Sequence, residues 1–288
     1  MELEGRTAVV TGGGNGIGRA IALALAERGA NVAVVDVERE AAGKVAGEAS
    51  SRGIAAAAYG VDVRDAGAVQ KLAEDCWSRF GSVELLFNNA GVIAEMGPVW
   101  LTDPLDVEWV LGVNLVGVLN GLRAFVPRFI ASGAPAWVVN TGSEHSLGLP
   151  HAMAGVYNAS KHAVLGLSDM LRAELPENVG VSVLCPGLVE STMWKATERR
   201  PDELGGAAAG AEANAAAMSF GLPASAVAEK VIEALENEYF YILTHPHVAE
   251  IAGRRAEEIG NAFASQAPRY DGDDRYDVNN VFRRLQSG

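Results

Sequence analysis

The sequence predicts an α/β fold built on a doubly wound, seven-stranded parallel sheet with helices on both faces. Three observations lead to this fold class. Short runs rich in β-branched residues alternate with longer amphipathic stretches along most of the chain. A strand, a helix and a strand in this succession form right-handed βαβ units, which build parallel sheets. The strand-like runs also continue through one chain of 288 residues without an obvious linker, which indicates a single domain.

The predicted elements follow one another regularly. The predicted strands are Thr7–Thr11, Asn31–Asp36, Ile54–Val61, Val83–Phe87, Ala136–Asn140, Val181–Leu184 and Tyr239–Leu243. The predicted helices are Ile17–Arg28, Glu38–Arg52, Ala66–Phe80, Ala159–Leu175 and Ala226–Glu236, the last with an apolar stripe that can pack on the sheet. We expect a catalytic domain over residues 1–265 and a polar, charged tail over residues 266–288.

Composition and charge exclude several classes of function. The net charge is −13, so an anionic nucleic-acid backbone or membrane surface would be repelled. The two cysteines, Cys76 and Cys185, lie inside apolar patterns and suit a reducing compartment. The longest apolar region, Trp109–Ala131, is interrupted by charged residues and proline, so we expect no membrane span. The expected location is the cytoplasm.

The segment TGGGNGIG after the first strand predicts a phosphate-binding turn. Gly12, Gly16 and Gly18 have the spacing G-x-x-x-G-x-G. Gly12 allows a sharp turn, Gly16 allows the backbone to approach a diphosphate, and Gly18 allows close packing of the helix on the sheet. The first N–H groups of the following helix and its dipole favour an anion.

Asp36 favours NAD over NADP. It ends the second predicted strand, about twenty residues beyond the glycine segment, where a carboxylate can accept hydrogen bonds from both adenosine ribose hydroxyls. The same carboxylate repels a 2′-phosphate. No Arg or Lys stands at Gly13, Gly14, Asn15 or Val37 to compensate for that repulsion.

Taken together, the motifs resemble those of the classical short-chain dehydrogenase/reductase family. The motifs are TGGGNGIG, NNAG at Asn88–Gly91, and Ser143 upstream of YNASK at Tyr157–Lys161. The match covers roughly the first 190 residues and the last helix and strand up to Leu243. The resemblance implies a single-domain Rossmann fold. It also implies a cofactor site formed by Gly12, Asn15, Gly16, Ile17, Gly18, Asp36, Asp62, Val63, Asn89, Ala90, Gly91, Tyr157, Lys161, Pro186, Gly187, Val189 and Ser191.

Two of these cofactor assignments have an alternative. Asp62 matches the adenine contact of the family, but it could instead cap the helix that starts near Asp65. In PGLVEST, either Ser191 or Thr192 could hold the carboxamide of nicotinamide, and we favour Ser191.

The catalytic candidates are Asn114, Ser143, Tyr157 and Lys161. Tyr157 and Lys161 are four residues apart, so on a helix they share a face. A phenol near pKa 10 is a poor base at neutral pH, and we expect the nearby ammonium to lower that pKa. Ser143 follows a strand at the edge where doubly wound sheets bind ligands, so its hydroxyl can hold a substrate oxygen. Asn114 matches the family's helix asparagine, which supports a water-linked proton path to the lysine.

The substrate pocket is expected to be mostly apolar. Its candidate residues are Glu144, His145, Met153, Leu188, Met193 and Trp194, with a lid over about residues 190–220. No metal site is expected, because the histidines lack a partner cluster with ligand spacing.

The predicted function is an NAD-dependent oxidoreductase that interconverts a hydrophobic, aryl or alicyclic secondary alcohol and its ketone. The expected partner is this small molecule, with no nucleic acid or membrane. The family resemblance further implies a homodimer or homotetramer paired through the regions Pro104–Ser132 and Val156–Leu175. The alternative function is an NAD(H)-binding regulatory sensor without turnover, although a sensor would not need an acid/base tyrosine.

Overall fold

The predicted sheet is present in a computed structural model that describes residues 1–148, 152–208 and 219–286. Its strands are parallel and lie in the order β3-β2-β1-β4-β5-β6-β7, which confirms the doubly wound fold class. They are β1 (Thr7–Thr11), β2 (Asn31–Asp36), β3 (Ala56–Gly60), β4 (Leu85–Asn88), β5 (Ala136–Thr141), β6 (Val179–Cys185) and β7 (Tyr241–Leu243).

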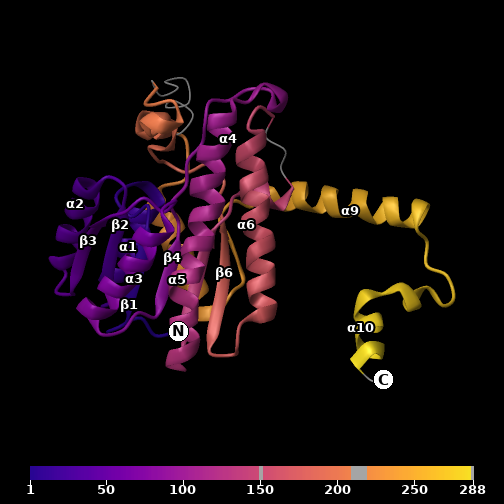
Figure 1. The fold of residues 1–288 in the computed structure, drawn as a ribbon, viewed down its shortest axis with the longest axis horizontal. Helices are drawn as coiled ribbons and strands as arrows, with labels where there is room; N and C mark the ends of the chain where they lie inside the picture. The colour runs from indigo at the N-terminus through magenta and orange to yellow at the C-terminus, as the bar shows by residue number, and fades with distance from the viewer. Residues whose placement is uncertain (149–151, 209–218, 287–288) are drawn as a thin grey trace. The chain divides into compact units, whose positions relative to one another are not determined.

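Helices cover both faces of the sheet (Figure 1). One face is covered by α1 (Gly16–Glu27), α2 (Arg39–Ser50) and α8 (Ala224–Asn237). The other is covered by α3 (Ala66–Phe80), α5 (Gly117–Ser132) and α6 (Gly155–Glu174). Shorter helical segments are α4 (Pro104–Leu111), a π turn at Gly112–Val116, and 3-10 turns at Val99–Leu101, Glu144–Leu147, Met193–Arg199 and Asp202–Leu204.

Local sequence explains where α3 begins and ends. Asp65 caps its first turn by accepting a hydrogen bond from the Ala68 amide at 3.0 Å, and the helix ends at Gly81, whose φ is +82°. Between these ends Val69, Leu72 and Cys76 face the sheet and are buried. Asp65 therefore has the capping role that had been the alternative for Asp62.

The order of the strands creates the ligand-binding edge. The chain leaves β1 toward β2 on one side and reaches β4 on the other, so the direction of winding reverses between β1 and β4. In doubly wound sheets a crevice opens at the carboxyl ends of the strands beside such a reversal. Thr11, Asn88, Thr141 and Cys185 end four adjacent strands at this edge.

Two element boundaries differ from prediction in ways that matter. Helix α6 begins at Gly155 instead of Ala159, so Tyr157 and Lys161 both lie on it. Strand β3 begins at Ala56 instead of Ile54, because its ladder with β2 starts at the Val32–Ala56 pair.

The stretch Pro104–Ser132 is long and apolar enough to cross a membrane by composition alone. In the structure 61% of its most apolar window is buried, and its large side chains Phe125 and Phe129 pack in the core with α3. The burial explains its hydrophobicity as that of a core helix.

The chain divides into two compact units, Met1–Pro246 and His247–Gly288. The second contains α9 (Val248–Gln266), a 3-10 turn at Asp273–Tyr276 and α10 (Val278–Gln286). The predicted boundary after residue 265 therefore falls at the end of α9 and not at the boundary of the sheet-bearing unit. Apolar side chains on these helices, Phe263 and Phe282 among them, are exposed.

Candidate active site

The glycine turn after β1 is closed tightly against its surroundings. Gly12 and Gly16 have positive φ values of +61° and +51°, which favour glycine. A Cβ atom on Gly18 would lie 2.1 Å from the Gly12 carbonyl oxygen, so α1 can approach the turn only through glycine. A Cβ on Gly12 would lie 2.9 Å from the Cα of Ala90. The cradle that the spacing predicts is therefore present, with bare backbone along it.

Asp36 is fixed beside this turn by two backbone amides. Its Oδ2 accepts a hydrogen bond from the Gly14 amide at 2.9 Å, and its Oδ1 accepts one from the Glu38 amide at 3.0 Å. These contacts orient the carboxylate at the edge of the pocket. Each oxygen has a second lone pair available to a ribose hydroxyl.

The two asparagines of NNAG brace the sheet edge. Asn88 is buried and donates to the Asn140 side chain at 2.9 Å, joining β4 to β5. Asn89 donates to the Thr11 carbonyl at 2.9 Å, and the Thr11 hydroxyl accepts from the Asn89 and Ala90 amides. The floor of the pocket is thereby tied to the end of β1.

The four catalytic candidates lie around the end of β5 and the start of α6. Ser143 lies two residues after the end of β5 and is buried, and hydrogen bonding from its side chain lowers the pKa of Tyr157. Lys161 is buried, with 2% of the residue exposed. Its ammonium donates to the Thr141 carbonyl at 2.8 Å and lies 5.7 Å from the centroid of the Tyr157 ring.

Asn114 completes this group from the π turn between α4 and α5. Its Oδ1 accepts from the Val92 amide at 2.8 Å, and its Nδ2 donates to the Val92 carbonyl and to the Ser160 hydroxyl. A Cβ on Gly91 would lie 3.4 Å from Lys161 Nζ and 3.5 Å from Asn114 Oδ1, so both side chains face the same glycine. π turns are rare and often occur at functional sites.

Burial shifts the two titratable groups in opposite directions. It raises the pKa of Tyr157 to about 12; the Ser143 hydrogen bond lowers this pKa and the negative charge of Glu144 raises it. Burial lowers the pKa of Lys161 to about 8. The expectation that Lys161 draws the phenol toward neutrality is wrong in this structure, because burial raises the pKa of Tyr157 and the ammonium lies on the Thr141 carbonyl.

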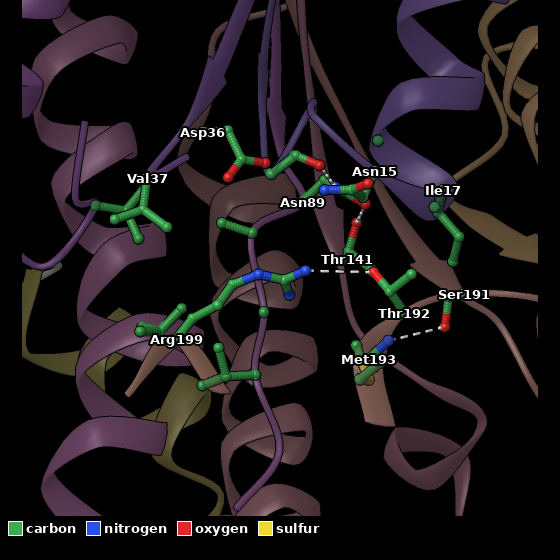
Figure 2. Close-up of a pocket in the computed structure, with 18 of the residues that line it drawn as sticks. Asn15, Ile17, Asp36, Val37, Asn89, Thr141, Ser191, Thr192, Met193 and Arg199 are labelled. Atoms are coloured by element: carbon green, nitrogen blue, oxygen red, sulfur yellow. Dashed lines mark hydrogen bonds between the residues drawn. The ribbon is translucent and has the colours of Figure 1, made fainter. Parts of the chain in front are cut away.

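Most of the residues predicted to bind the cofactor surround one pocket (Figure 2). Those lining it are Gly12, Asn15, Gly16, Ile17, Gly18, Asp36, Asp62, Val63, Asn89, Ala90, Gly91, Tyr157, Lys161, Pro186 and Ser191. Gly187 and Val189 are not in the lining. Val189 is buried in the core cluster, and Gly187 packs against the His245 ring.

Several lining residues were not predicted. They are Val37, Val61, Arg64, Val92, Trp109, Val113, Thr141, Gly142, Arg199 and Pro201. Ser191 and its alternative Thr192 both line the pocket, so both remain candidates to contact a ligand bound there. Asp62 accepts hydrogen bonds from the Arg64 guanidinium at 2.7 and 2.9 Å.

The predicted substrate residues are more scattered. Met193 lines the cofactor pocket, whereas Glu144, His145, Met153, Leu188 and Trp194 do not. His145 is close to the chemistry: its ring meets the Tyr157 ring edge-on at 5.5 Å, and it hydrogen-bonds to Asn158. Met153 and Leu188 are partly exposed. Of the predicted lid, residues 209–218 lie outside the described residues.

His245 supports the loop that follows β6. Its Nδ1 accepts from the Gly187 amide at 3.1 Å, so its Nε2 carries the proton and donates to the Leu188 carbonyl at 3.0 Å. The HPH segment that contains His245 did not predict this role. It had been considered only as part of a metal site, which its spacing does not suit. Among the described residues, no group of three or more His, Cys, Asp or Glu side chains could hold a metal ion.

The buried lysine predicts a pH-dependent stability. Because its pKa is lowered from 10.5 to about 8, the unfolded chain binds more protons than the folded chain between these values, so stability rises with pH in that window. Wild type is therefore expected to gain about 2 kcal/mol over Lys161→Met between pH 7 and 9.5. Urea unfolding of both proteins at the two pH values measures this difference.

A matched control for this measurement is Lys71→Met, which removes an ammonium from the exposed face of α3. Its stability difference from wild type is expected to stay constant over the same range. Measurements stop below pH 10 because the raised pKa of Tyr157 acts in the opposite sense above it. If the stability difference between wild type and Lys161→Met stays constant with pH, or changes in the other direction, the pKa of the buried ammonium is not lowered.

The pocket fits a nicotinamide dinucleotide. It combines a backbone cradle that side chains would fill, a carboxylate at one end, and a buried lysine beside a tyrosine at the other. The cradle and the helix N-terminus suit a diphosphate, and the carboxylate suits ribose hydroxyls.

Comparison with known proteins agrees with this geometry. Residues 6–202 match the family model described as short chain dehydrogenase. The chain is 33% identical to the C alpha-dehydrogenase of Sphingobium sp. strain SYK-6, covering 86% of this chain and 83% of that protein. It is 35% identical to 1-deoxy-11-beta-hydroxypentalenate dehydrogenase of Streptomyces exfoliatus, with 85% of each covered.

A solved structure extends the comparison to three dimensions. A short chain dehydrogenase/reductase from Burkholderia phymatum in complex with NAD superposes with a TM-score of 0.84, at 36% identity, covering 91% of this chain and 96% of that one. Sequence, fold and site agree, and the chain belongs to the short-chain dehydrogenase/reductase family of nicotinamide-dependent oxidoreductases.

Proposed function

We propose that the protein is an NAD-dependent dehydrogenase that interconverts a hydrophobic secondary alcohol and its ketone. The observation that carries this proposal is that Tyr157 and the buried Lys161 line one end of the pocket together, with the buried side chain of Ser143 acting on the phenol. An acid/base phenol, a hydroxyl that can hold the reacting oxygen and an ammonium meet there. A regulatory sensor has no use for this combination.

In the direction of reduction, Tyr157 donates its proton to the carbonyl oxygen of the substrate. Its high pKa keeps it protonated at neutral pH, and Ser143 donates a hydrogen bond that holds the same oxygen in place. When bound, a nicotinamide cofactor would supply the hydride-transfer chemistry of the reaction. Lys161 lies 5.7 Å from the centroid of the Tyr157 ring with its ammonium on the Thr141 carbonyl, and it faces Gly91 together with Asn114.

The preference for NAD rests on a carboxylate. Asp36 is oriented toward the pocket by two amides, so a 2′-phosphate would meet its negative charge. Ser191 is the proposed contact of the carboxamide, and Asp62 with Val63 that of adenine, since all three line the pocket.

The proposed substrate is bulky and hydrophobic. The residues near the catalytic ones in the sequence include His145, Met153, Leu188, Met193 and Trp194. Of these, Leu188 and Met153 expose apolar surface. The relatives named C alpha-dehydrogenase and 1-deoxy-11-beta-hydroxypentalenate dehydrogenase support dehydrogenation, the second of a hydroxylated carboxylate. An aryl or alicyclic alcohol therefore fits the site best.

A cytoplasmic location and a homodimer or homotetramer belong to the same proposal. Both cysteines are buried and unoxidised, as suits a reducing compartment. Val116, Leu119 and Ile130 near α5, and Met170 on α6, expose apolar surface on the two helices predicted to pair.

The test is a turnover assay that follows the absorbance of reduced nicotinamide. NAD⁺ and NADP⁺ are compared across aliphatic, alicyclic and aryl secondary alcohols. Turnover with NAD⁺, highest for bulky alcohols, is the expected result. Turnover with NADP⁺ alone would overturn the role of Asp36. Tight NADH binding without turnover on any alcohol or ketone of the panel would favour the sensor.

A further inference from the structure

The Ser191–Leu204 segment contributes several residues to the lining of the cofactor pocket. Three ion pairs connect it to other parts of the fold. Arg199 Nε lies 2.5 Å from Glu38 Oε2, in the loop after β2. Arg200 lies 2.8 Å from Asp106 of α4, and Glu203 lies 3.1 Å from Arg64 after β3. Three separate core elements therefore anchor one short stretch of chain.

Arg199 differs from the other cations of this stretch because it lines the cofactor pocket. Figure 2 shows its side chain reaching between Val37 on one side and Thr192 on the other. Its terminal nitrogen lies 3.5 Å from the Thr192 hydroxyl, and its side chain is 28% exposed. Contacts to Glu38 and Thr192 use two of the five N–H donors of the guanidinium, among the residues that the structure describes.

The guanidinium also lies next to the chain that covers the glycine turn. Thr192 follows Ser191, and a Cβ on Gly16 would lie 3.3 Å from the Cβ of Ser191. Arg199 thus connects the ribose side of the pocket, at Glu38, with the cover of the glycine turn, at Thr192. A ligand bound along that turn from Asp36 toward Lys161 would pass this cation.

Among the cations of the described lining, Arg199 is the one that pairs with a single carboxylate, Glu38. Arg64 is engaged by Asp62 and Glu203, and Lys161 lies at the catalytic end with its ammonium on the Thr141 carbonyl. The net charge of the chain is −13, so a local cation beside the glycine turn would favour a diphosphate there. Guanidinium is well suited to phosphate because it offers parallel N–H donors.

We propose that Arg199 binds the diphosphate of the cofactor from outside the glycine turn. The anion would compete with Glu38 for the guanidinium and would hold the Ser191–Leu204 segment closed. This inference rests on the cofactor binding of the family and not on the alcohol substrate. It therefore stands or falls separately from the proposed reaction.

The test measures binding of ADP-ribose and of adenosine by titration calorimetry, so no turnover is needed. Arg199→Gln is expected to weaken ADP-ribose binding about 10- to 100-fold, since a charge-assisted contact to phosphate is lost. Adenosine binding is expected to stay unchanged, and Arg199→Lys to recover part of the loss. Raising the salt concentration is expected to weaken wild type more than Arg199→Gln.

Two variants control for a purely structural role of the ion pair. Glu38→Gln breaks the same pair but keeps the cation, and it is expected to bind ADP-ribose at least as tightly as wild type. Lys195→Gln removes a neighbouring charge that stacks on Trp194 outside the pocket lining, and it is expected to behave as wild type.

Three results would overturn the proposal. Equal losses in Arg199→Gln and Glu38→Gln would make the pair a structural clamp only. An unchanged affinity of Arg199→Gln for ADP-ribose would remove the cation from the site. A loss seen only with 2′-phosphorylated ADP-ribose would assign Arg199 to the 2′-phosphate of NADP instead.

Discussion

Tyr157→Phe is expected to lower kcat/KM by about 10³-fold or more while cofactor affinity stays within about twofold of wild type. Phenylalanine keeps the ring and its edge-on contact with His145, and it removes the hydroxyl that hydrogen-bonds to Ser143. The proton that the substrate oxygen must gain or lose then has no donor at that position. Steady-state turnover and NADH fluorescence titration measure the two quantities separately.

Stability is expected to change little in the same variant. Ser143 Oγ still accepts from the His145 amide at 3.3 Å, so its oxygen keeps a partner and the loss is about 1 kcal/mol. Tyr241→Phe, on the exposed strand β7, is the matched control and should leave turnover unchanged. A Tyr157→Phe enzyme with more than a tenth of wild-type turnover would exclude the phenol as the acid, and His145 would become the next candidate.

The sequence was sufficient for the sheet and for the residues beside its edge. Strand-like runs, glycine spacing and Asp36 are local signals, and each concerns residues within one βαβ unit. Their positions follow once the strands are placed in parallel, because the carboxyl ends meet at a common edge. The lining residues Gly12, Gly16, Gly18 and Asp36 were predicted for this reason.

Residues brought to the pocket by later segments were missed. Arg199 and Pro201 reach it only because the chain after β6 folds back and forms ion pairs with Glu38 and Asp106. Trp109 had the appearance of a core residue in an apolar run, and its neighbour Val113 enters the lining through the π turn. No local pattern distinguishes such residues from ordinary core or surface positions.

The direction of the pKa shift of Tyr157 was also predicted incorrectly. The four-residue spacing places Lys161 near Tyr157, but it does not say which acceptor the ammonium takes. The Thr141 carbonyl takes it, and burial then raises the pKa of Tyr157. Desolvation depends on the whole neighbourhood of a group, which the spacing of two residues does not contain.

Gly18→Ala is expected to weaken NADH binding by more than about 100-fold and to destabilise the fold by about 1–3 kcal/mol. The added methyl would lie 2.1 Å from the Gly12 carbonyl oxygen and 2.5 Å from the side-chain nitrogen Nδ2 of Asn89. Both neighbours are held in place, since Asn89 donates to the carbonyls of Thr11 and Gly12. The helix must therefore move away from the turn, and the cradle for the diphosphate opens.

Gly43→Ala separates this effect from a general response to alanine. Gly43 lies inside α2, and a Cβ there would meet nothing within 4 Å, so the replacement is expected to stabilise the protein by about 0.5–1 kcal/mol without changing NADH affinity. Fluorescence titration and thermal unfolding of the two variants give the comparison. If Gly18→Ala bound NADH as wild type does, the close approach of α1 to the turn would not be needed for the cofactor. The third glycine would then serve helix packing alone, and the dinucleotide would depend on Gly12, Gly16 and the cations around them.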